Sequence, residues 1–264
     1  MKKTTQKRAC VGLIFIAALL IKIPVANAQQ QSFVFPQVAD GVFDGGYYKT
    51  TFMIQPAQQS STSVVICGYV LHGLGVDLDG KGLVTEWMAA ISPGSYYVAS
   101  TSADQQLRTG YATLSCTDSV YAQVLYSAYA KDGTNIAQAT VPGSSDSSCS
   151  ALNSAQMTAD QQGGSQLGIA IANNTTQTQS YGVIFNSAPG VTPIFSLQGM
   201  VTVPAQTSVA KFLTEIMPAT SNTVGWVEII PADRYCCLGT GFSAIALRYT
   251  GATFTTIPVA CYLC

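Results

Sequence analysis

Apolar and polar residues alternate with a period of two along most of this chain. Residues 120–130, VYAQVLYSAYA, place five apolar side chains on one face of an extended strand. Residues 166–173, QLGIAIAN, place Leu167, Ile169 and Ile171 on one face, with only Gly and Ala between them. Runs rich in Val, Ile, Tyr and Thr are separated by Gly, Pro, Asn and Asp turns about every 8 to 15 residues. The pattern predicts an all-β fold of antiparallel, immunoglobulin-like β-sandwiches.

One segment departs from this period. In the sequence KFLTEIMP, the apolar residues Phe212, Leu213, Ile216 and Met217 share a face at helical spacing, and Pro218 ends the pattern. We therefore expect a single helical turn at this place.

The chain also repeats itself, because four short stretches of the first half recur in the same order in the second half. The matched pairs are Ile54 and Ile171, Pro93 and Pro204, Gly110 and Gly225, and Pro142 and Pro258, with offsets of 117, 111, 115 and 116 residues. We interpret this as a tandem duplication of one domain of about 115 residues. The Ser-rich stretch 144–150 is then a linker between β-sandwich domains at 29–143 and 151–264.

The first 28 residues have the pattern of a secretory signal peptide. Four basic residues within positions 2–8 precede an apolar run, Val11–Leu20, and the small-x-small sequence at 26–28 supplies a cleavage site. The apolar run is short for a membrane span, and an uncleaved N-terminal anchor is the alternative. We expect cleavage after Ala28 and a mature protein that is secreted, displayed at the cell surface or kept in the periplasm, with no further membrane span.

Removal of the signal peptide changes the charge of the chain. The full sequence has 12 basic and 13 acidic residues. Five of the basic residues lie in the signal peptide, so the mature chain keeps seven against 13 acidic ones, a net charge of −6. Nucleic-acid binding requires a basic face, so nucleic acid is not an expected partner. The low content of charged residues favours an extracellular β protein whose surface is mainly Ser, Thr, Gln and Asn.

Export bears on the eight cysteines, because cysteines outside the cytoplasm usually form disulfides. A zinc site and a redox pair are the alternatives. Cys236 and Cys237 are adjacent, however, whereas zinc knuckles use spaced pairs. Cys67 and Cys116 are the cysteines in the body of the first unit, and we expect them to bond to each other.

The remaining cysteines lie in the linker and the second unit. We expect each of Cys236 and Cys237 to bond to one member of the C-terminal pair, Cys261 and Cys264, which would tie the end of the chain to the sheet. A bond between the two adjacent cysteines would be strained. Cys149 is then the odd thiol, either free or engaged in an intermolecular bond.

The start of the mature chain, FVFPQVADGVFDGGYYKTTFMIQ, resembles the opening of secreted bacterial tandem β-sandwich proteins of unknown function. The positions that match their F-P-x-x-A-D-G motif are Phe35, Pro36, Ala39, Asp40 and Gly41. The resemblance covers most of residues 33–260, but the extra cysteines and the lack of this motif before the second unit depart from it. It implies the fold and the compartment and carries no activity.

Residues that could perform catalysis are few. His72 is the single histidine, and the chain has no G-x-S-x-G nucleophile motif. The densest acids are Asp77, Asp79 and Glu86, and DLDGKG is typical of a hairpin turn. A calcium loop would need an oxygen ligand where Lys81 stands. We expect no catalytic residue, no metal site and no cofactor.

Exposed aromatic residues are the remaining candidates for binding. The doublets Tyr47-Tyr48 and Tyr96-Tyr97 should each bury one ring and expose the other if they lie in strands, and an exposed ring can stack on sugars or dock a protein. The alternative is that the outer rings shield the second face of the sheet. The two tryptophans, Trp87 and Trp226, are expected in the core.

These observations support two functions. The first is a non-enzymatic extracellular module for adhesion, surface display or ligand binding, with a glycan or a protein as the unknown partner. The alternative is a secreted, glycosidase-like hydrolase that uses carboxylates from loops of both units, and a cleft with two carboxylates would favour it.

Overall fold

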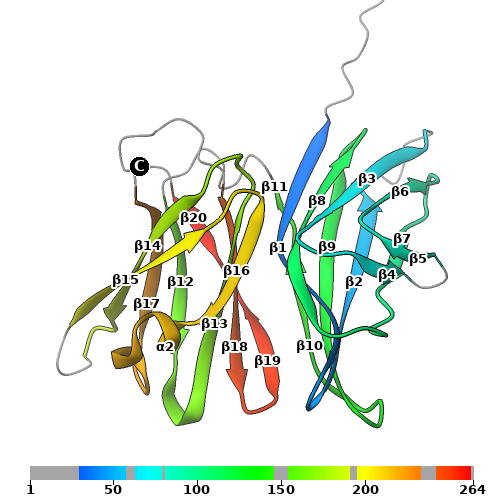
Figure 1. Ribbon diagram of the computed structural model, residues 1–264. Helices are drawn as coiled ribbons and strands as arrows, with labels where there is room; N and C mark the ends of the chain where they lie inside the picture. The colour runs from blue at the N-terminus through cyan, green and yellow to red at the C-terminus, as the bar shows by residue number, and fades with distance from the viewer. Residues whose placement is uncertain are drawn as a thin grey trace, which may run out of the picture.

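The computed structural model describes residues 30–57, 63–78, 81–145, 154–190, 195–232 and 242–262. Most of these residues form antiparallel strands, which fall into two groups side by side (Figure 1). The all-β, sandwich-like fold expected from the period-two pattern is therefore confirmed. In the part of the chain that the structure describes, no helix is long and apolar enough to span a membrane.

The first group contains β1 to β11. Their bounds are β1 Gln31–Phe43, β2 Gly46–Pro56, β3 Val65–His72, β4 Val76–Leu78, β5 Gly82–Val84, β6 Glu86–Ile91, β7 Tyr97–Ser100, β8 Arg108–Cys116, β9 Val120–Ala130, β10 Asn135–Pro142 and β11 Ser144–Ser145. The strand order is β10-β9-β2-β1-β8-β3-β6, with β7 paired to β2 and β11 paired to β1. The short strands β4 and β5 form a hairpin around the DLDGKG turn, as the sequence predicts.

The strand β1 connects the two layers of this first group. It pairs with β8 over most of its length and with β2 over its last three residues, and its register shifts between Phe35 and Val38. The shift occurs at Pro36, which has no backbone N–H to donate to a neighbouring strand. The two layers are therefore joined into one continuous sheet at β1.

The F-P-x-x-A-D-G residues have structural roles at this crossing. Asp40 is buried and accepts a hydrogen bond from the backbone N–H of Ala103 at 3.0 Å. Gly41 has a φ of +120°, and a Cβ atom there would lie 2.6 Å from the carbonyl oxygen of Gln105. A side chain at this position would therefore be strained and would clash, which explains the glycine.

The second group contains β12 to β20. Their bounds are β12 Ser154–Asp160, β13 Ser165–Asn173, β14 Gln179–Ser187, β15 Ser196–Val203, β16 Thr207–Phe212, β17 Val224–Pro231, β18 Phe242–Thr250, β19 Thr253–Ile257 and β20 Ala260–Tyr262. Two sheets result, β15-β14-β17-β12-β20 and β16-β13-β18-β19. The expected helical turn is confirmed as α2, Leu213–Ile216, and 3-10 turns occur at Gln162–Gly164 and Pro218–Thr220.

The strand pairings of the two groups correspond. Six strand pairings of the first group recur in the second group. In the first group they are β10–β9, β9–β2, β2–β7, β1–β8, β8–β3 and β3–β6. In the second group the corresponding pairings, in the same order, are β19–β18, β18–β13, β13–β16, β12–β17, β17–β14 and β14–β15. Gly110 on β8 and Gly225 on β17 also occupy matching places. A Cβ atom on either would lie 2.2 or 2.1 Å from a carbonyl oxygen of the neighbouring strand. The duplication itself stays a prediction from the sequence repeat.

Aromatic residues fill the core of the first group. Phe52 contacts Trp87 edge to face at 5.1 Å, and Trp87 stacks on Tyr69 at 4.5 Å. The expectation that Trp87 is in the core is confirmed, but it is wrong for Trp226, whose side chain is 37% exposed. On β17 the buried residues Gly225, Val227 and Ile229 alternate with less buried ones, so Trp226 points outward.

The disulfide between Cys67 and Cys116 is confirmed and joins β3 to β8. Three of the cysteines expected to pair, Cys236, Cys237 and Cys264, lie outside the described residues, as does Cys149, the expected odd thiol. The backbone of Cys261 pairs with β12, and its side chain is outside the described part of the structure.

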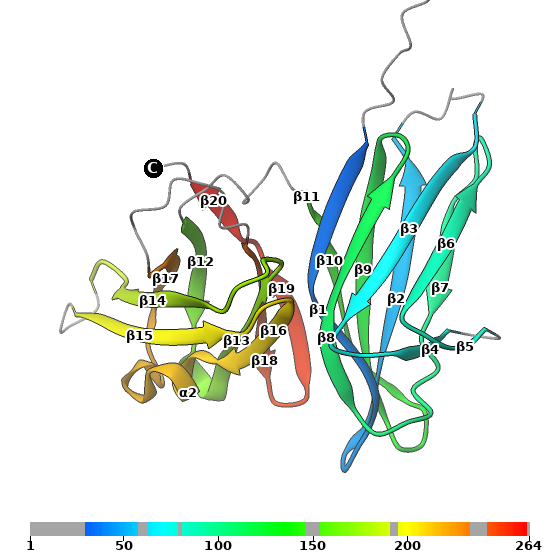
Figure 2. The same ribbon diagram turned by 45° about the horizontal axis from the view of Figure 1, so that its top comes forward.

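The two groups meet along an apolar junction. The strands β1 and β10 of the first group face β18 and β19 of the second in both views (Figures 1 and 2). Ala170, Ile245, Leu247 and Phe254 of the second group are buried in the same cluster as the core of the first. The Thr256 hydroxyl donates a hydrogen bond across the junction to the backbone carbonyl oxygen of Thr140 at 2.8 Å.

Candidate functional site

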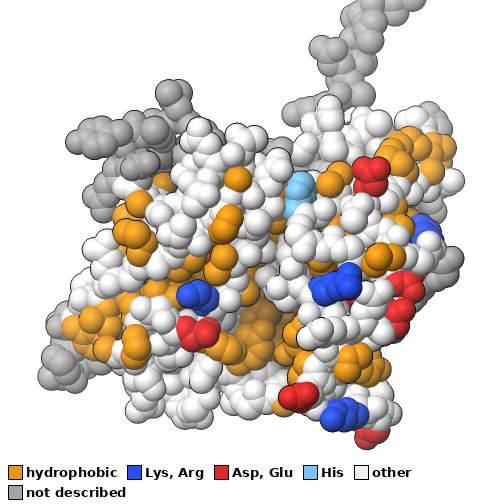
Figure 3. Space-filling model, in the orientation of Figure 1, with side chains coloured by type: hydrophobic (Ala, Val, Ile, Leu, Met, Phe, Trp, Pro, Cys, Tyr) orange, Lys and Arg blue, Asp and Glu red, His pale blue; other side chains and the backbone are white. Residues whose placement is uncertain are grey.

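A cleft opens at this junction, and we call it the junction cleft. Its volume is about 210 Å³, and its walls come from β13, β16 and β18 of the second group and from Gln37 on β1 of the first. In the space-filling view, apolar side chains line the bottom of a hollow between the two groups (Figure 3). The cleft thus combines residues that are far apart in the sequence.

The walls of the junction cleft are mostly apolar, and β13 contributes small apolar residues to them. Its inward face carries large residues, whereas Gly168 and Ala170 face the cleft. Phe212 is opposite Gly168 on the neighbouring strand, and a Cβ atom on Gly168 would lie 2.9 Å from the ring of Tyr249. The small residue therefore makes room for two rings, and Phe212 and Tyr249 contact edge to face at 5.2 Å.

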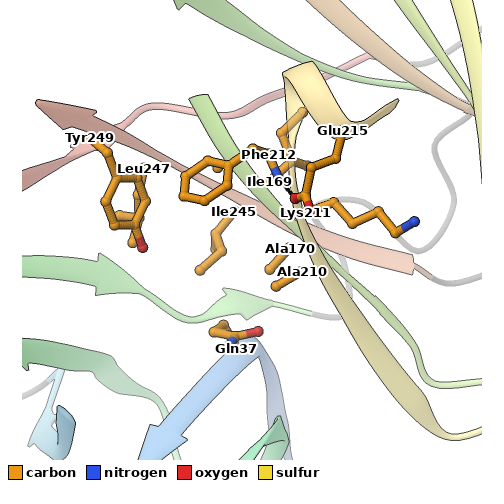
Figure 4. Close-up of a pocket in the computed structure, with 11 residues that line it drawn as sticks. Gln37, Ile169, Ala170, Ala210, Lys211, Phe212, Glu215, Ile245, Leu247 and Tyr249 are labelled. Carbon is orange, nitrogen blue, oxygen red and sulfur yellow. Dashed lines mark hydrogen bonds between the residues drawn. The ribbon is translucent and has the colours of Figure 1, made fainter. Parts of the chain in front are cut away.

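Gln37 is the residue of the first group that lines the cleft. Its backbone carbonyl accepts a hydrogen bond from the Tyr126 hydroxyl. Its side-chain oxygen Oε1 is buried and has no hydrogen-bond partner among the described residues. Figure 4 shows this side chain facing Ala170, Ala210 and Ile245 across the cleft. A buried acceptor without a partner lowers the stability of the folded protein.

Two charged residues lie at the rim of the cleft. Glu215 Oε2 accepts a hydrogen bond from the backbone N–H of Phe212 at 2.6 Å. The side chain of Lys211 extends away from the other lining residues (Figure 4). Burial raises the pKa of Tyr249 to about 12, so its hydroxyl is neutral and can donate a hydrogen bond at neutral pH. The interior of the cleft is therefore neutral.

A second hollow of about 120 Å³ adjoins the junction cleft. Gln37, Leu247 and Tyr249 line both spaces and form the waist between them. The second hollow extends toward the first group and is closed by Tyr48 and Phe254. We call these two adjoining spaces together the elongated site; its lining is mostly apolar in the junction cleft and includes Lys49 and Thr109 in the second hollow.

The four tyrosines singled out in the sequence have different surroundings. Tyr47 stacks on Tyr129 at 4.9 Å, and Tyr48 stacks on Phe43 and lines the second hollow. Both rings of this doublet are half-buried, so the expectation of one exposed ring is wrong here, since Tyr129 covers Tyr47.

The second doublet fits the expectation better. Tyr96 is 75% exposed and precedes β7 rather than lying in it, beside Gln55. Tyr97 is half-buried, packs against the core and lies under the Lys81 ammonium group at 5.6 Å. Of the four predicted tyrosines, Tyr48 contributes to the elongated site.

His72 has the surroundings of a structural residue. Its Nε2 lies 3.2 Å from the Thr113 hydroxyl, and its ring stacks on Tyr111 at 4.2 Å. Burial lowers the pKa of His72, which favours the neutral ring. The hydrogen bonds found for its side chain in the described residues include no carboxylate.

The acids of the DLDGKG region do not form a site in the described residues. The carbonyl oxygen of Asp77 accepts a hydrogen bond from the N–H of Ser102 at 2.9 Å, and Glu86 is exposed on β6. Asp79 lies outside the described residues. Within the described ranges, no three His, Cys, Asp or Glu side chains gather closely enough to hold a metal ion.

Comparisons with known protein families, with curated proteins and with solved structures give no match to this chain.

The sequence pattern did not predict four of the residues that line the site, namely Gln37, Phe212, Leu247 and Tyr249. One signal was present, because residues 166–173 have Gly and Ala between their large apolar residues, so neither face of that strand is polar. A strand with two apolar faces is covered on both sides. The position of the first group against the second, which makes the cleft, could not be read from this pattern.

Proposed function

We propose that this chain is an exported, non-enzymatic binding protein and that the junction cleft receives a small apolar ligand. The observation that carries the proposal is a mostly apolar cleft of about 210 Å³ between the two groups, with Gln37 of the first group in its lining. Ligand sites are typically concave and apolar with a small number of placed polar groups, and they occur preferentially between domains.

The size of the cleft suits a small apolar group. An apolar cavity of about 150 Å³ holds one benzene ring. The junction cleft, at about 210 Å³, therefore has room for one ring or a short alkyl chain, and the second hollow extends it.

The lining favours binding over glycoside hydrolysis. A glycosidase holds its substrate between two carboxyl groups. Glu215 is the one carboxylate among the described residues that line the junction cleft, and it accepts a hydrogen bond from a backbone N–H. A sugar is also a poor match to this cleft, because its hydroxyl groups would lack partners on apolar walls. Adhesion to a glycan or protein through Tyr96 is a second role that its 75% exposure favours.

Export and the sequence resemblance belong to the same proposal. The Cys67–Cys116 disulfide is compatible with an oxidising compartment outside the cytoplasm. The roles found for Pro36, Asp40 and Gly41 at the β1 crossing are compatible with the resemblance to secreted tandem β-sandwich proteins.

The test is binding of small probes to the mature protein, followed by amide chemical shifts in NMR spectra. The probes are phenol, cyclohexanol and, as a polar ring, methyl α-glucoside. At about 0.6 kcal/mol for each of its seven non-hydrogen atoms, phenol should bind with a Kd of about 1 mM. We expect saturable shifts at Gly168, Ala170 and Leu247 with phenol and cyclohexanol, and none with the glucoside.

Two tryptophan variants locate the site. Ala210 is exposed on the edge strand β16 and lines the cleft, so Ala210→Trp should fill it and abolish the shifts. Ala90 is exposed on the edge strand β6, and Ala90→Trp is the matched control that should leave binding unchanged. Phenol binding that persists in Ala210→Trp, or preferential binding of the glucoside, would refute the proposed function.

A further inference from the structure

Two strongly exposed tyrosines lie on one face of the first group. Tyr121 on β9 is 69% exposed, and Tyr96, just before β7, is 75% exposed. Tyr47 and Tyr129 cover each other by stacking, whereas no aromatic ring among the described residues stacks on Tyr96 or Tyr121. The two exposed rings are therefore available to a partner that is not part of the chain.

The strand register places Gln55 between the two exposed tyrosines. β2 pairs with β9 without a register shift, and Gln55 is directly opposite Tyr121. On the other side of β2, Tyr97 is opposite Ile54, so Tyr96 comes next along this ladder, beside Gln55. Tyr96 and Gln55 also border the same small hollow of about 50 Å³. The side chains of Tyr96, Gln55 and Tyr121 thus form one row across the sheet (Figure 2), which we call the tyrosine row.

The tyrosine row and the row beside it are uncharged. In the neighbouring row, Met53 is opposite Val98 on one side and Gln123 on the other. Val98, Gln123 and Gln55 are exposed. An amide side chain both donates and accepts hydrogen bonds, as the hydroxyl groups of a sugar do. The chemistry of this face therefore suits a neutral ligand with many hydroxyl groups and flat apolar faces.

The spacing of the two tyrosines matches that of an extended glycan. Neighbouring strands lie about 4.8 Å apart, so Tyr96 and Tyr121, on either side of β2, are about 10 Å apart across the sheet. A pyranose unit linked through equatorial C1 and C4 positions advances a glycan by about 5 Å, because it comprises a six-membered ring and one bridging oxygen with bonds of about 1.5 Å. Two alternate units of such a chain therefore reach both tyrosines, and the unit between them lies over Gln55.

We propose that the tyrosine row binds a neutral, extended, β-1,4-linked glycan that lies across the strands; this develops the second role given above for Tyr96 and does not depend on the junction cleft. The C–H groups of the first and third sugar units pack on the rings of Tyr96 and Tyr121. The hydroxyl groups of the middle unit exchange hydrogen bonds with the amide of Gln55. An α-1,4-linked glucan curves instead of lying flat, so its alternate units do not reach both rings. The row should therefore distinguish the two linkages.

The experiment is an NMR titration of the mature protein with cellotetraose and, as the matched control, maltotetraose, which has the same units joined by α-linkages. We expect saturable amide shifts at Gln55, Tyr96 and Tyr121 with cellotetraose, and none with maltotetraose at the same concentration. Tyr96→Ser and Tyr121→Thr should each weaken binding about tenfold, because each removes one stacked ring. Tyr121→Trp keeps an aromatic ring and should retain binding. Met200→Thr changes an exposed residue on β15 of the second group and should leave binding unchanged.

The outcomes separate this proposal from the proposed function of the cleft. No binding of cellotetraose, equal affinity for cellotetraose and maltotetraose, or unchanged affinity in Tyr96→Ser and Tyr121→Thr overturns the glycan assignment. Shifts centred on Trp226, the exposed aromatic residue of β17, overturn it as well. Phenol should bind to the junction cleft equally in Tyr121→Thr and in the wild type, because Tyr121 does not line the cleft. Failure of the glycan to bind therefore leaves the cleft proposal intact, and failure of phenol to bind leaves the tyrosine row intact.

Discussion

Removal of the Cys67–Cys116 disulfide should reveal how strongly the two groups of strands depend on each other. The bond joins β3 to β8 across a sequence separation of 49 residues. Closing a loop of this length removes chain entropy from the unfolded state that corresponds to about 4 kcal/mol at 25 °C. The replacement of both cysteines by alanine should therefore lower the free energy of unfolding by about this amount.

The shift in melting temperature depends on the size of the cooperative unit. The entropy of unfolding is about 2.1 cal/mol/K per residue. A loss of about 4 kcal/mol then lowers Tm by about 17 °C if a unit of about 115 residues unfolds alone, and by about 8 °C if about 230 residues unfold together. Because Ile245, Leu247 and Phe254 of the second group are buried with the core of the first, we expect one transition and the smaller shift.

Differential scanning calorimetry of the wild type and of the single and double variants tests this reasoning. Cys67→Ala alone and Cys116→Ala alone should each cost nearly as much as the double variant, because either change removes the whole bond. Two separate transitions, of which one shifts by about 17 °C, would show that the junction does not couple the groups. If each single variant lost little free energy of unfolding and the two losses added up in the double variant, the disulfide would contribute little to stability.

Three further predictions concern single positions. Gly110→Ala and Gly225→Ala should each cost about 2 kcal/mol or more in chemical denaturation, because the added Cβ overlaps a carbonyl oxygen of the next strand, and a loss below about 0.5 kcal/mol at either would contradict this. Burial raises the pKa of Asp40 above its value in the unfolded chain, so the protonated carboxyl group stabilises the folded state at low pH. This contribution to the free energy of unfolding is lost as the pH rises through the pKa of Asp40 in the folded state. Asp40→Asn should therefore gain stability relative to the wild type as the pH rises above about 4, and urea midpoints without such a trend would refute it. Burial lowers the pKa of His72, so the wild type should lose stability as the pH falls below about 6.5, and His72→Gln should lack this loss; an unchanged pH dependence of the urea midpoint in the variant would contradict it.

The period-two pattern predicted the strands well because each group buries one face of each sheet. Val120 and Val124 are buried on β9 with exposed polar residues between them, as expected from the alternation. The same reasoning did not predict that β1 joins two layers. That crossing depends on the register shift beside Pro36 and on the hydrogen bond from Ala103 to Asp40, which are contacts between distant segments.

The candidate site was harder to predict for a related reason. Gln37, Phe212 and Tyr249 come from three distant segments, and they meet because the outer face of β13 and β18 covers the side of the first group. In the sequence that face appears as Gly168 and Ala170, small residues that carry no chemical signal of their own. Tyr48 was predicted as a binding residue from its doublet, and it lines the second hollow.

The most direct test of the junction cleft as a binding site is the position of a bound probe. Intermolecular nuclear Overhauser effects between cyclohexanol and the methyl groups of the mature protein give that position. We predict contacts from cyclohexanol to Ala170, Ile245 and Leu247, all lost in Ala210→Trp. Contacts confined to the outer surface around Tyr96, or no contacts at saturating probe, would contradict the account.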